Sequence, residues 1–178
     1  VNLSYNGTTI GTVVADGTGT FSYALSSSDL TRIGQGVNKQ IAISQSDAAG
    51  NSSRVTIDFA VDTIAPSLAT IESLGGFDKS VSSVQSDRIV RGKAEIGSTI
   101  TLRSIAGTQR TELARMVVDD SGTYQYVLTA KNLQDVGQGV GKKIEVVSTD
   151  LAGNASISRP FDFRVEALWS TGTSSNDV

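Results

Sequence analysis

Short stretches in which apolar and polar residues alternate recur along the whole chain. Residues 20–25 (TFSYAL) alternate in this way, and so do residues 100–102 and 144–147. A period of two is typical of a strand with one buried face, and glycine, asparagine and aspartate turns separate these stretches. No stretch has the spacing of a long amphipathic helix, and single helical turns are expected only at 28–33 and 131–136. The pattern therefore predicts an all-β protein of short strands.

The chain also repeats itself. The acidic turn SDAAGN at 46–51 returns as TDLAGN, which places its aspartates Asp47 and Asp150 at a separation of 103 residues. At the same offset GQGV is found twice, FSYAL matches YQYVL, and VVADGTGT matches MVVDDSGT. IDFAVD at 57–62 matches FDFRVE at 161–166 with one extra residue. Coincidences spread over about a hundred residues indicate two copies of one structural unit.

The second copy has the strand content of an immunoglobulin-like sandwich. Seven strands are predicted in it, at 66–74, 88–94, 98–105, 111–118, 123–129, 143–149 and 155–166. About seven short strands in about 100 residues is typical of that fold. The first copy starts at the equivalent of Ile100, so the counterparts of its first two strands are missing, and we expect them to have been cleaved, to be disordered or to be supplied by another chain through strand exchange.

These patterns predict a specific domain organisation. We expect tandem immunoglobulin-like β-sandwiches, the first of which lacks its N-terminal strands. The incomplete domain is assigned to residues 1–62 and contains strands three to seven. A complete domain follows at 63–166, and residues 167–178 are assigned to a linker or to the start of another module. Trp169 lies in this last segment, whose sequence departs from the repeat and indicates that the following module is of another kind.

Composition narrows the possible chemistry. The net charge of −3, from 18 acidic and 15 basic residues, is not that of a protein that binds nucleic acid or an anionic membrane. The chain has no cysteine and no histidine, which excludes disulfides, thiolate metal sites and histidine acid–base catalysis. Oxygen donors remain, and these suit calcium or magnesium. We expect no enzyme, since acidic residues on turn tips do not form the enclosed site that a two-carboxylate hydrolase needs.

The expected topology gathers the acidic turns at one end of the second sandwich. Connections in such a fold alternate between its two ends, so the turns at 94–97, 118–122 and 149–154 should share the end at which the chain enters through 61–66. Carboxylates brought together there would repel one another unless a cation lay among them. The residues expected to converge between the two domains are Asp62, Glu95, Asp119, Asp120 and Asp150.

A structural role for the same aspartates stays open. An aspartate in a D-x-x-G-N turn can accept hydrogen bonds from the amides of its own turn. This alternative applies to Asp150, and a hairpin role applies to one of Asp119 and Asp120. At the opposite end, Asp78 and Asp87 lie near Glu166, where they form either a second cation site or a solvated loop.

Four segments together resemble a known family. GKAEIGSTITL at 92–102, VVDDSGTYQYVL at 117–128, TDLAGNAS at 149–156 and VDTIAP at 61–66 are similar to the bacterial Ig-like repeats of giant RTX-type adhesins. The resemblance covers nearly all of the second copy and the remaining part of the first.

The resemblance implies a role as well as a fold. It implies extender rods at the bacterial cell surface, exported by type I secretion and associated with biofilms, in which calcium ions lie between neighbouring repeats. It further implies that Asp62, Glu95, Asp119 and Asp150 are junction ligands, and that Asp16 and Asp47 serve the preceding junction. The alternative is a β-sandwich that itself binds a glycan or a host protein, for which the polar stretch at 75–86 is the best candidate.

Overall fold

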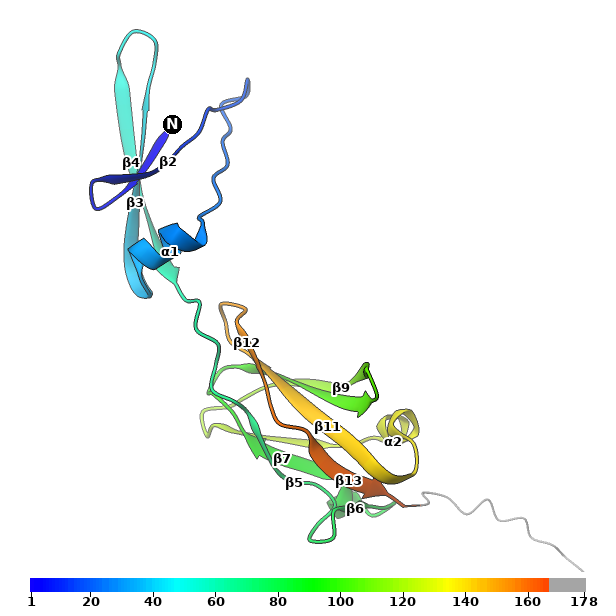
Figure 1. Cartoon of the computed structure of the whole chain (residues 1–178). Coiled ribbons are helices and arrows are strands. Elements are labelled where there is room, and N and C mark those ends of the chain that lie inside the picture. Colours follow the sequence, from blue (N-terminus) through cyan, green and yellow to red (C-terminus); the bar gives the residue numbers. More distant parts are fainter. Residues whose placement is uncertain (167–178) are drawn as a thin grey trace, which may run out of the picture. The chain divides into compact units, whose positions relative to one another are not determined.

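The structure is a computed structural model that describes residues 1–166, and the chain divides into two compact units. Unit 1 spans Val1–Thr63, and unit 2 begins at Ile64. Strands dominate both units, and each contains one short α-helix (Figure 1). The prediction of an all-β protein of immunoglobulin-like sandwich type is confirmed.

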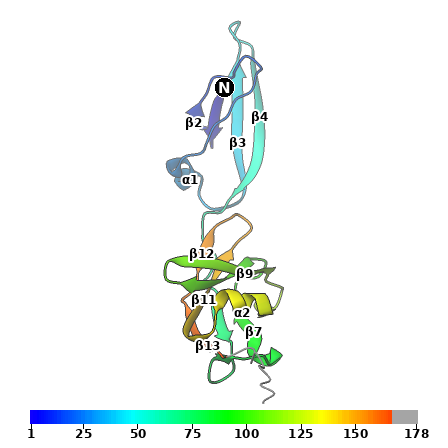
Figure 2. The same cartoon turned by 90° about the vertical axis from the view of Figure 1, so that its right-hand side faces the viewer.

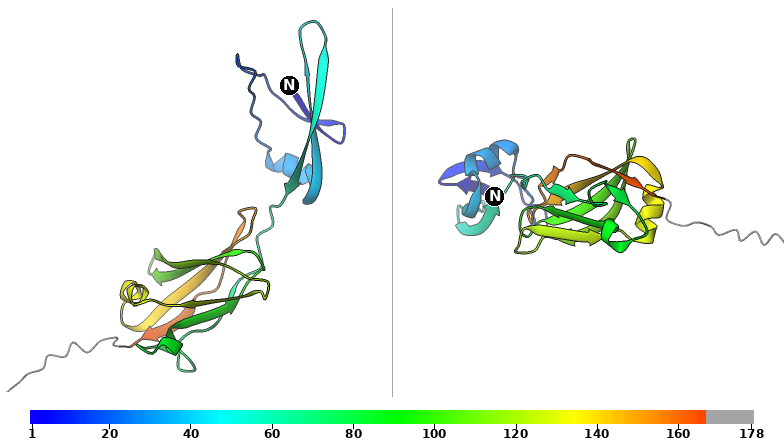
Figure 3. Two further views of the ribbon diagram at one scale, coloured as in Figure 1. Left: turned by 180° about the vertical axis from the view of Figure 1, so that it is seen from behind. Right: turned by 90° about the horizontal axis from the view of Figure 1, so that it is seen from below.

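Unit 2 consists of two sheets (Figures 1 and 3). The smaller sheet has the order β10-β7-β5, and the larger has the order β6-β13-β11-β8-β9 with β12 paired to β11. All strand pairs are antiparallel except β13 with β6. The strands are β5 (Thr70–Ser73), β6 (Ser80–Val81), β7 (Ile89–Lys93), β8 (Thr99–Ala106), β9 (Gln109–Val117), β10 (Thr123–Val127), β11 (Gly139–Thr149), β12 (Ala155–Ile157) and β13 (Phe161–Val165).

The core of unit 2 lies between these sheets. Val90 comes from the smaller sheet, whereas Leu102, Ile144 and Val146 come from the larger, and all four are fully buried. Ile144 and Val146 are alternate residues of one strand, so they share a face, as the period of two predicts. Burial of this apolar surface is the main force that holds the two sheets together.

A short helix stands at the same place in both units (Figure 2). It is α1 (Ser27–Ile33) in unit 1 and α2 (Ala130–Val136) in unit 2, as the predicted helical turns anticipated. Ser26 and Thr129 cap the helices, each within a capping box closed by the side chain three residues on. Within residues 1–166 the structure contains no helix long and apolar enough to cross a membrane.

The repeated GQGV sequence forms the same β-bulge in both units. In unit 2, Gly139 pairs with Val165 and Lys142 with Phe163, so that three steps along β11 face two along β13. In unit 1, β3 (Gly36–Ser46) shows the same shift against β4 (Ser52–Val61). Gly36 and Gly139 have φ angles of 112° and 102°, which residues with side chains rarely adopt. The repeat of this sequence is therefore explained by backbone geometry.

Unit 1 has a single sheet with the order β2-β1-β3-β4. β1 (Asn2–Tyr5) and β2 (Thr8–Thr12) form a hairpin through Asn6 and Gly7, whose positive φ angles of 48° and 78° are those of a type I′ turn. The buried core of this unit is small and consists of Leu3, Ile33, Ile41 and Val61.

One strand prediction was wrong. Residues 20–25 were expected to form a strand because they alternate like their counterpart, yet only the counterpart, β10, is a strand. β10 owes its ladder of hydrogen bonds to β7. Unit 1, which the structure describes in full, contains no equivalent of β7, so residues 20–25 have no partner with which to form a ladder.

Three smaller features of unit 2 also differ from expectation. The last strand, predicted at 155–166, is divided into β12 and β13 by residues 158–160, where Pro160 has no amide hydrogen to donate. β6 and a 3₁₀ helix at Gln85–Arg88 were not predicted.

Candidate functional site

The two D-x-x-G-N turns are built in the same way. Asp47 Oδ1 accepts hydrogen bonds from the backbone amides of Ala49 and Asn51, both at 2.9 Å, and Oδ2 accepts one from Asn51 Nδ2 at 2.7 Å. In unit 2, Asp150 Oδ1 and Oδ2 accept from the backbone amide and the Nδ2 of Asn154, both at 2.9 Å. Each carboxylate therefore holds its own turn together, as the structural alternative for these aspartates requires.

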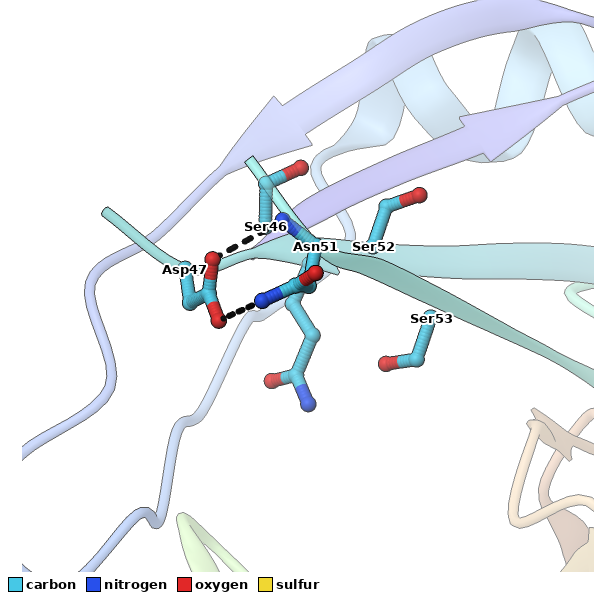
Figure 4. Close-up of a pocket in the computed structure, with 6 residues that line it drawn as sticks. Ser46, Asp47, Asn51, Ser52 and Ser53 are labelled. Atoms are coloured by element: carbon cyan, nitrogen blue, oxygen red, sulfur yellow. Dashed lines mark hydrogen bonds between the residues drawn. The ribbon is translucent and has the colours of Figure 1, made fainter. Parts of the chain in front are cut away.

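An open polar pocket lies beside the Asp47 turn (Figure 4). The Asp47 carboxylate faces Asn51, to which both of its oxygens are hydrogen-bonded in the view. The pocket has a volume of about 390 Å³ and is lined by Gln45, Ser46, Asp47, Asn51, Ser52 and Ser53.

A second pair of equivalent aspartates uses one carboxylate oxygen. Asp16 Oδ1 accepts from Thr18 N at 2.9 Å, Thr18 Oγ1 at 2.6 Å and Thr20 N at 3.0 Å. Asp119 Oδ1 likewise accepts from Ser121 N at 2.9 Å and Ser121 Oγ at 2.5 Å. Because these bonds end on Oδ1, Oδ2 of both residues is the oxygen that a ligand from outside the turn would meet.

The hydrogen bonds of these turns favour ionised carboxylates. The side chain of Asn51 lowers the pKa of Asp47, and the side chain of Asn154 lowers the pKa of Asp150. Hydroxyl groups act in the same way at the other two turns, where Thr18 lowers the pKa of Asp16 and Ser121 that of Asp119. Donors that bond to a carboxylate stabilise its charged form, so all four side chains are anionic at neutral pH.

Three of the acidic loops meet at one end of unit 2. Gly97 N donates to the carbonyl of Val118 at 3.0 Å, and Ala94 N donates to that of Gly122 at 3.1 Å. Thr99 pairs with Thr149, which brings the turn at 149–154 next to these two loops. The Glu95 carboxylate accepts a hydrogen bond from the backbone amide of Ser67 at 3.1 Å.

The carboxylates at these loops do not form a ready metal cage. Within residues 1–166, no group of three or more acidic side chains lies close enough together to hold a metal ion. Asp62 follows the last residue of β4 directly. The ligand set of Asp62, Glu95, Asp119, Asp120 and Asp150, with Asp16 and Asp47 for another junction, therefore stays a prediction.

The carboxylates at the opposite end of unit 2 have a cation from the protein itself. Arg164 Nη2 lies 3.2 Å from Asp78 Oδ2 and 3.5 Å from Glu166 Oε1. Ser80 Oγ also donates to Glu166 Oε1 at 2.6 Å, whereas Asp87 accepts from Ser82 Oγ. The guanidinium therefore pairs with Asp78 and Glu166, two of the three carboxylates considered for a second cation site.

The polar stretch at 75–86 is partly structural. Ser80 and Val81 are buried in β6, which pairs with the last strand of the sandwich. Phe77, in contrast, is fully exposed. Residues 76–79 and 83–86 on either side of β6 are exposed and remain open to a ligand.

Sequence reasoning missed a buried ionic cluster on the larger sheet. Glu145 is only 5% exposed, and its Oε1 lies 2.7 Å from Arg103 Nη2 and 3.0 Å from Arg110 Nε. The available signal was a glutamate between Ile144 and Val146, which interrupts an apolar run. Next to this cluster is a polar groove of about 340 Å³, lined by Thr99, Thr101, Arg103, Glu112, Arg115, Val147 and Thr149.

Part of the chain matches a known protein family. Residues 79–166 match the family described as the bacterial Ig domain. Most of the second unit thus matches the bacterial Ig domain family. The match extends from the loop before β6 to the end of β13, and so includes the acidic turns at Asp119 and Asp150.

Solved structures similar to the chain include domains of adhesins and of a biofilm-associated protein. A Ca²⁺-stabilised adhesin with which an Antarctic bacterium binds ice is 24% identical, with 96% of this chain and 40% of that chain covered and a TM-score of 0.42. The BSP domain of a biofilm-associated protein is 15% identical, with coverages of 95% and 25% and a TM-score of 0.41. A tetra-tandem repeat from the extending region of a large adhesion protein is 16% identical, with coverages of 91% and 40% and a TM-score of 0.40.

The extent of these similarities is limited. The chain spans less than half of the length of each of these three chains. Their TM-scores are too low to establish a common fold over the whole chain. No curated protein matches the chain. The assignment to the bacterial Ig domain family therefore rests on residues 79–166.

Proposed function

We propose that the chain is a structural, non-enzymatic extender segment of a bacterial cell-surface adhesin. The observation that carries this proposal is the repetition of one building plan along the chain. Residues 79–166 of unit 2 match the bacterial Ig domain family, and unit 1 repeats the capped helix, the GQGV bulge and the acidic turn of unit 2. Stacked copies of a small domain are a means of covering distance, and the partners of each copy are its neighbours in the chain.

The second part of the proposal is that calcium stiffens the joint between the two units. The proposed ligands are loop carboxylates, and the anionic state of two of them supports the role. Hydrogen bonds keep Asp119 and Asp150 ionised, and Oδ2 of Asp119 is not used by its own turn's bonds. Calcium prefers such oxygen donors. The full set is Asp62, Glu95, Asp119, Asp120 and Asp150, and Asp16 and Asp47 would serve the equivalent joint with any domain that precedes unit 1.

This ion would be bound by loops that close on it. Because residues 1–166 contain no preformed group of three acidic side chains, the ligands would have to come together as the ion binds. Calcium binding at such a site would therefore restrict bending at the joint. Export by type I secretion and a place outside the cell belong to the same proposal, since millimolar calcium is characteristic of that environment.

The expected energies favour an effect on bending over an effect on folding. Extracellular calcium sites have dissociation constants of about 0.1–1 mM. At about 1 mM free calcium, binding would stabilise the folded state by only about 0.4–1.4 kcal/mol per site. The same energy can shift the equilibrium between bent and extended states of a hinge, because these states differ little in free energy.

Small-angle X-ray scattering of the full chain tests the calcium role. We expect a larger maximum dimension in calcium than in chelator for the wild type. Asp62→Ala and Asp119→Ala should abolish the difference. The control is Asp58→Ala, which removes a carboxylate from β4, the strand directly before Asp62. Asp58 accepts a hydrogen bond from Gln40 and is not a proposed ligand, so this variant should preserve the difference. Equal dimensions for the wild type in calcium and chelator would contradict the calcium role and leave the extender role in place.

Phe77 favours a second candidate function. This aromatic side chain is fully exposed in the stretch at 75–86, as a contact for a glycan or a host protein would be. Binding of the chain to a glycan array, lost in Phe77→Ala and retained in Val84→Ala, would support a ligand-binding module. Absence of wild-type binding would count against it.

A further inference from the structure

The strand β4 leaves one edge of the sheet in unit 1 unpaired. β4 is the last strand in the order β2-β1-β3-β4, and β3 is its only partner strand within residues 1–166 (Figure 2). Every residue at 52–58 is exposed. The amide and carbonyl groups of this stretch that point away from β3 therefore form an edge that can accept another strand.

Unit 2 protects the same edge, whereas unit 1 does not. In unit 2 the corresponding strand is divided into β12 and β13 around Pro160. β4 runs without a break for 10 residues and contains neither proline nor lysine, two residues that commonly keep an edge from pairing. β6 pairs only with Arg164 and Val165, whose counterparts in unit 1 are the last two residues of β4. A strand placed like β6 would therefore leave residues 52–58 free.

The two charged side chains of β4 are arranged symmetrically. Arg54 and Asp58 lie two positions before and two positions after Thr56, and all three residues are exposed. Alternate residues of a strand share a face, so both charges lie on the same side of the sheet. Asp58 accepts a hydrogen bond from the neutral side chain of Gln40 at 2.8 Å. In the described part of the chain neither charge belongs to an ion pair, so both are available to a partner.

The other face of the same stretch is apolar. Val55 and Ile57 flank Thr56 directly and are 56% and 50% exposed. Both side chains are β-branched, and such side chains stabilise a sheet when they lie opposite each other on neighbouring strands. β4 thus has one charged face and one apolar face, and each is symmetric about Thr56.

We propose that β4 is a docking edge for β4 of a second copy of the chain, with the two strands antiparallel and a two-fold axis at Thr56. In this register Arg54 of each copy lies opposite Asp58 of the other, on one face of the joined sheet. On the other face, Val55 of each copy lies opposite Ile57 of the other. The ladder of backbone hydrogen bonds provides affinity, and the side-chain pairs set the register. Because the contact is two-fold, it closes at a dimer.

Other antiparallel registers are less favourable. An axis at Val55 or Ile57 places each charge opposite an uncharged residue. An axis at Arg54 or Asp58 places two like charges directly opposite each other, which destabilises a pair of strands. The sequence of β4 therefore selects the axis at Thr56.

Sedimentation velocity of the full chain in chelator tests the proposal. We expect the average mass to rise from that of one chain to that of two as the concentration is raised. Arg54→Asp places two aspartates opposite each other at both charge pairs, and Asp58→Arg places two arginines there. Each variant should raise the dissociation constant of the dimer by about tenfold or more. Arg32→Asp, the same change of charge at an exposed residue of α1, should leave the dissociation constant unchanged.

A mixture of the two variants provides the sharpest test. The Arg54→Asp chain carries two aspartates on its edge, and the Asp58→Arg chain carries two arginines, so each repels its own kind. Together they restore both opposite-charge pairs, and we expect heterodimers with about the affinity of the wild type. The double variant, in which the two charges are exchanged, should form homodimers again. Recovery in the mixture would also show that the single substitutions do not act by unfolding unit 1.

Three results would overturn the proposal. One is a wild-type chain that stays monomeric at every concentration. Another is a dimer that neither single substitution weakens, since a different surface would then hold it together. The third is a mixture of the two variants that stays monomeric. Chelator removes the proposed calcium joint from these measurements, and scattering at a concentration where the chain is monomeric keeps the test of that joint independent of β4 pairing.

Discussion

The phenol of Tyr124 packs directly against the backbone of Gly92, its partner on the neighbouring strand. The two residues are paired between β10 and β7, and the Tyr124 hydroxyl donates a 2.7 Å hydrogen bond to the carbonyl of Thr70 on β5. A Cβ atom at position 92 would lie 1.9 Å from that carbonyl oxygen and 2.4 Å from the tyrosine hydroxyl. Burial raises the pKa of Tyr124, which therefore remains a neutral donor at physiological pH. One glycine thus lets a single side chain tie together all three strands of the smaller sheet.

Substitution of this glycine should be costly. Gly92→Ala forces a methyl group onto a backbone oxygen that cannot move without disturbing β5, and we expect a loss of about 3 kcal/mol or more in the free energy of unfolding of unit 2. Gly17→Ala is the matched control, since its Cβ would meet nothing within 4 Å, and it should change stability by less than about 0.5 kcal/mol. Urea unfolding of both variants measures the difference. Equal stabilities would show that the smaller sheet shifts more freely than this contact suggests.

The acidic turn of unit 2 should make stability depend on pH. The pKa of Asp150 is lowered in the folded state below its ordinary value of 3.8, chiefly by the Asn154 side chain. A carboxyl group with a depressed folded pKa contributes stability above its unfolded pKa, and this contribution is lost as the pH falls through the folded pKa. We therefore expect Asp150→Asn to lower the melting temperature at pH 7 and to have little effect below the pKa of the folded carboxyl.

Thermal unfolding followed by circular dichroism at a series of pH values checks this prediction. Asp162→Asn serves as a control, because Asp162 is an exposed residue that pairs with Lys143 on the surface. If the difference in melting temperature between the wild type and Asp150→Asn persisted unchanged into strong acid, the charge of Asp150 would not contribute to the stability of the turn.

Equivalent leucines in the two units should differ in their contributions. Leu102 is fully buried under the smaller sheet, whereas Leu3 lies in the smaller core of unit 1 beside the partly exposed Ile43. Leu102→Ala should cost about 3–5 kcal/mol, and Leu3→Ala about 2 kcal/mol, because the less enclosed site can relax. Chemical denaturation, with exchange used to assign each transition to its unit, provides the test. A larger cost at Leu3 would contradict the weaker packing inferred for unit 1.

The Glu145 cluster should respond to loss of charge. Glu145→Gln leaves Arg103 and Arg110 without their carboxylate, and we expect unit 2 to lose about 2–3 kcal/mol, less than a fully buried pair because both arginines are partly exposed. Urea unfolding measures the cost. A double-mutant cycle with Arg103→Met isolates the pair, and additive effects of the two substitutions would show that the ion pair contributes nothing.

Local sequence was sufficient for features that are made locally. Single helical turns were expected at 28–33 and 131–136, and these are α1 and α2, whose capping residues and glycine ends lie within a few positions of one another. The position of the acidic turns followed from the repeat. The sequence did not show which residues pair with Glu145, because the arginines that do so lie on two other strands. The proposed calcium ligands stay a prediction, because they come from separate loops and local sequence does not determine how such loops meet.

Taken alone, the sequence determined the period of two, the repeat at 103 residues and hence the all-β class, because alternation and turn residues depend only on the order of neighbouring residues. It did not determine which alternating stretches become strands. FSYAL at 21–25 and YQYVL at 124–128 have the same pattern, yet only the second is part of a sheet. A strand exists through hydrogen bonds to another strand, and β7 supplies them to one of these stretches and not to the other. Only the tertiary structure, which brings distant partners together, decided that difference.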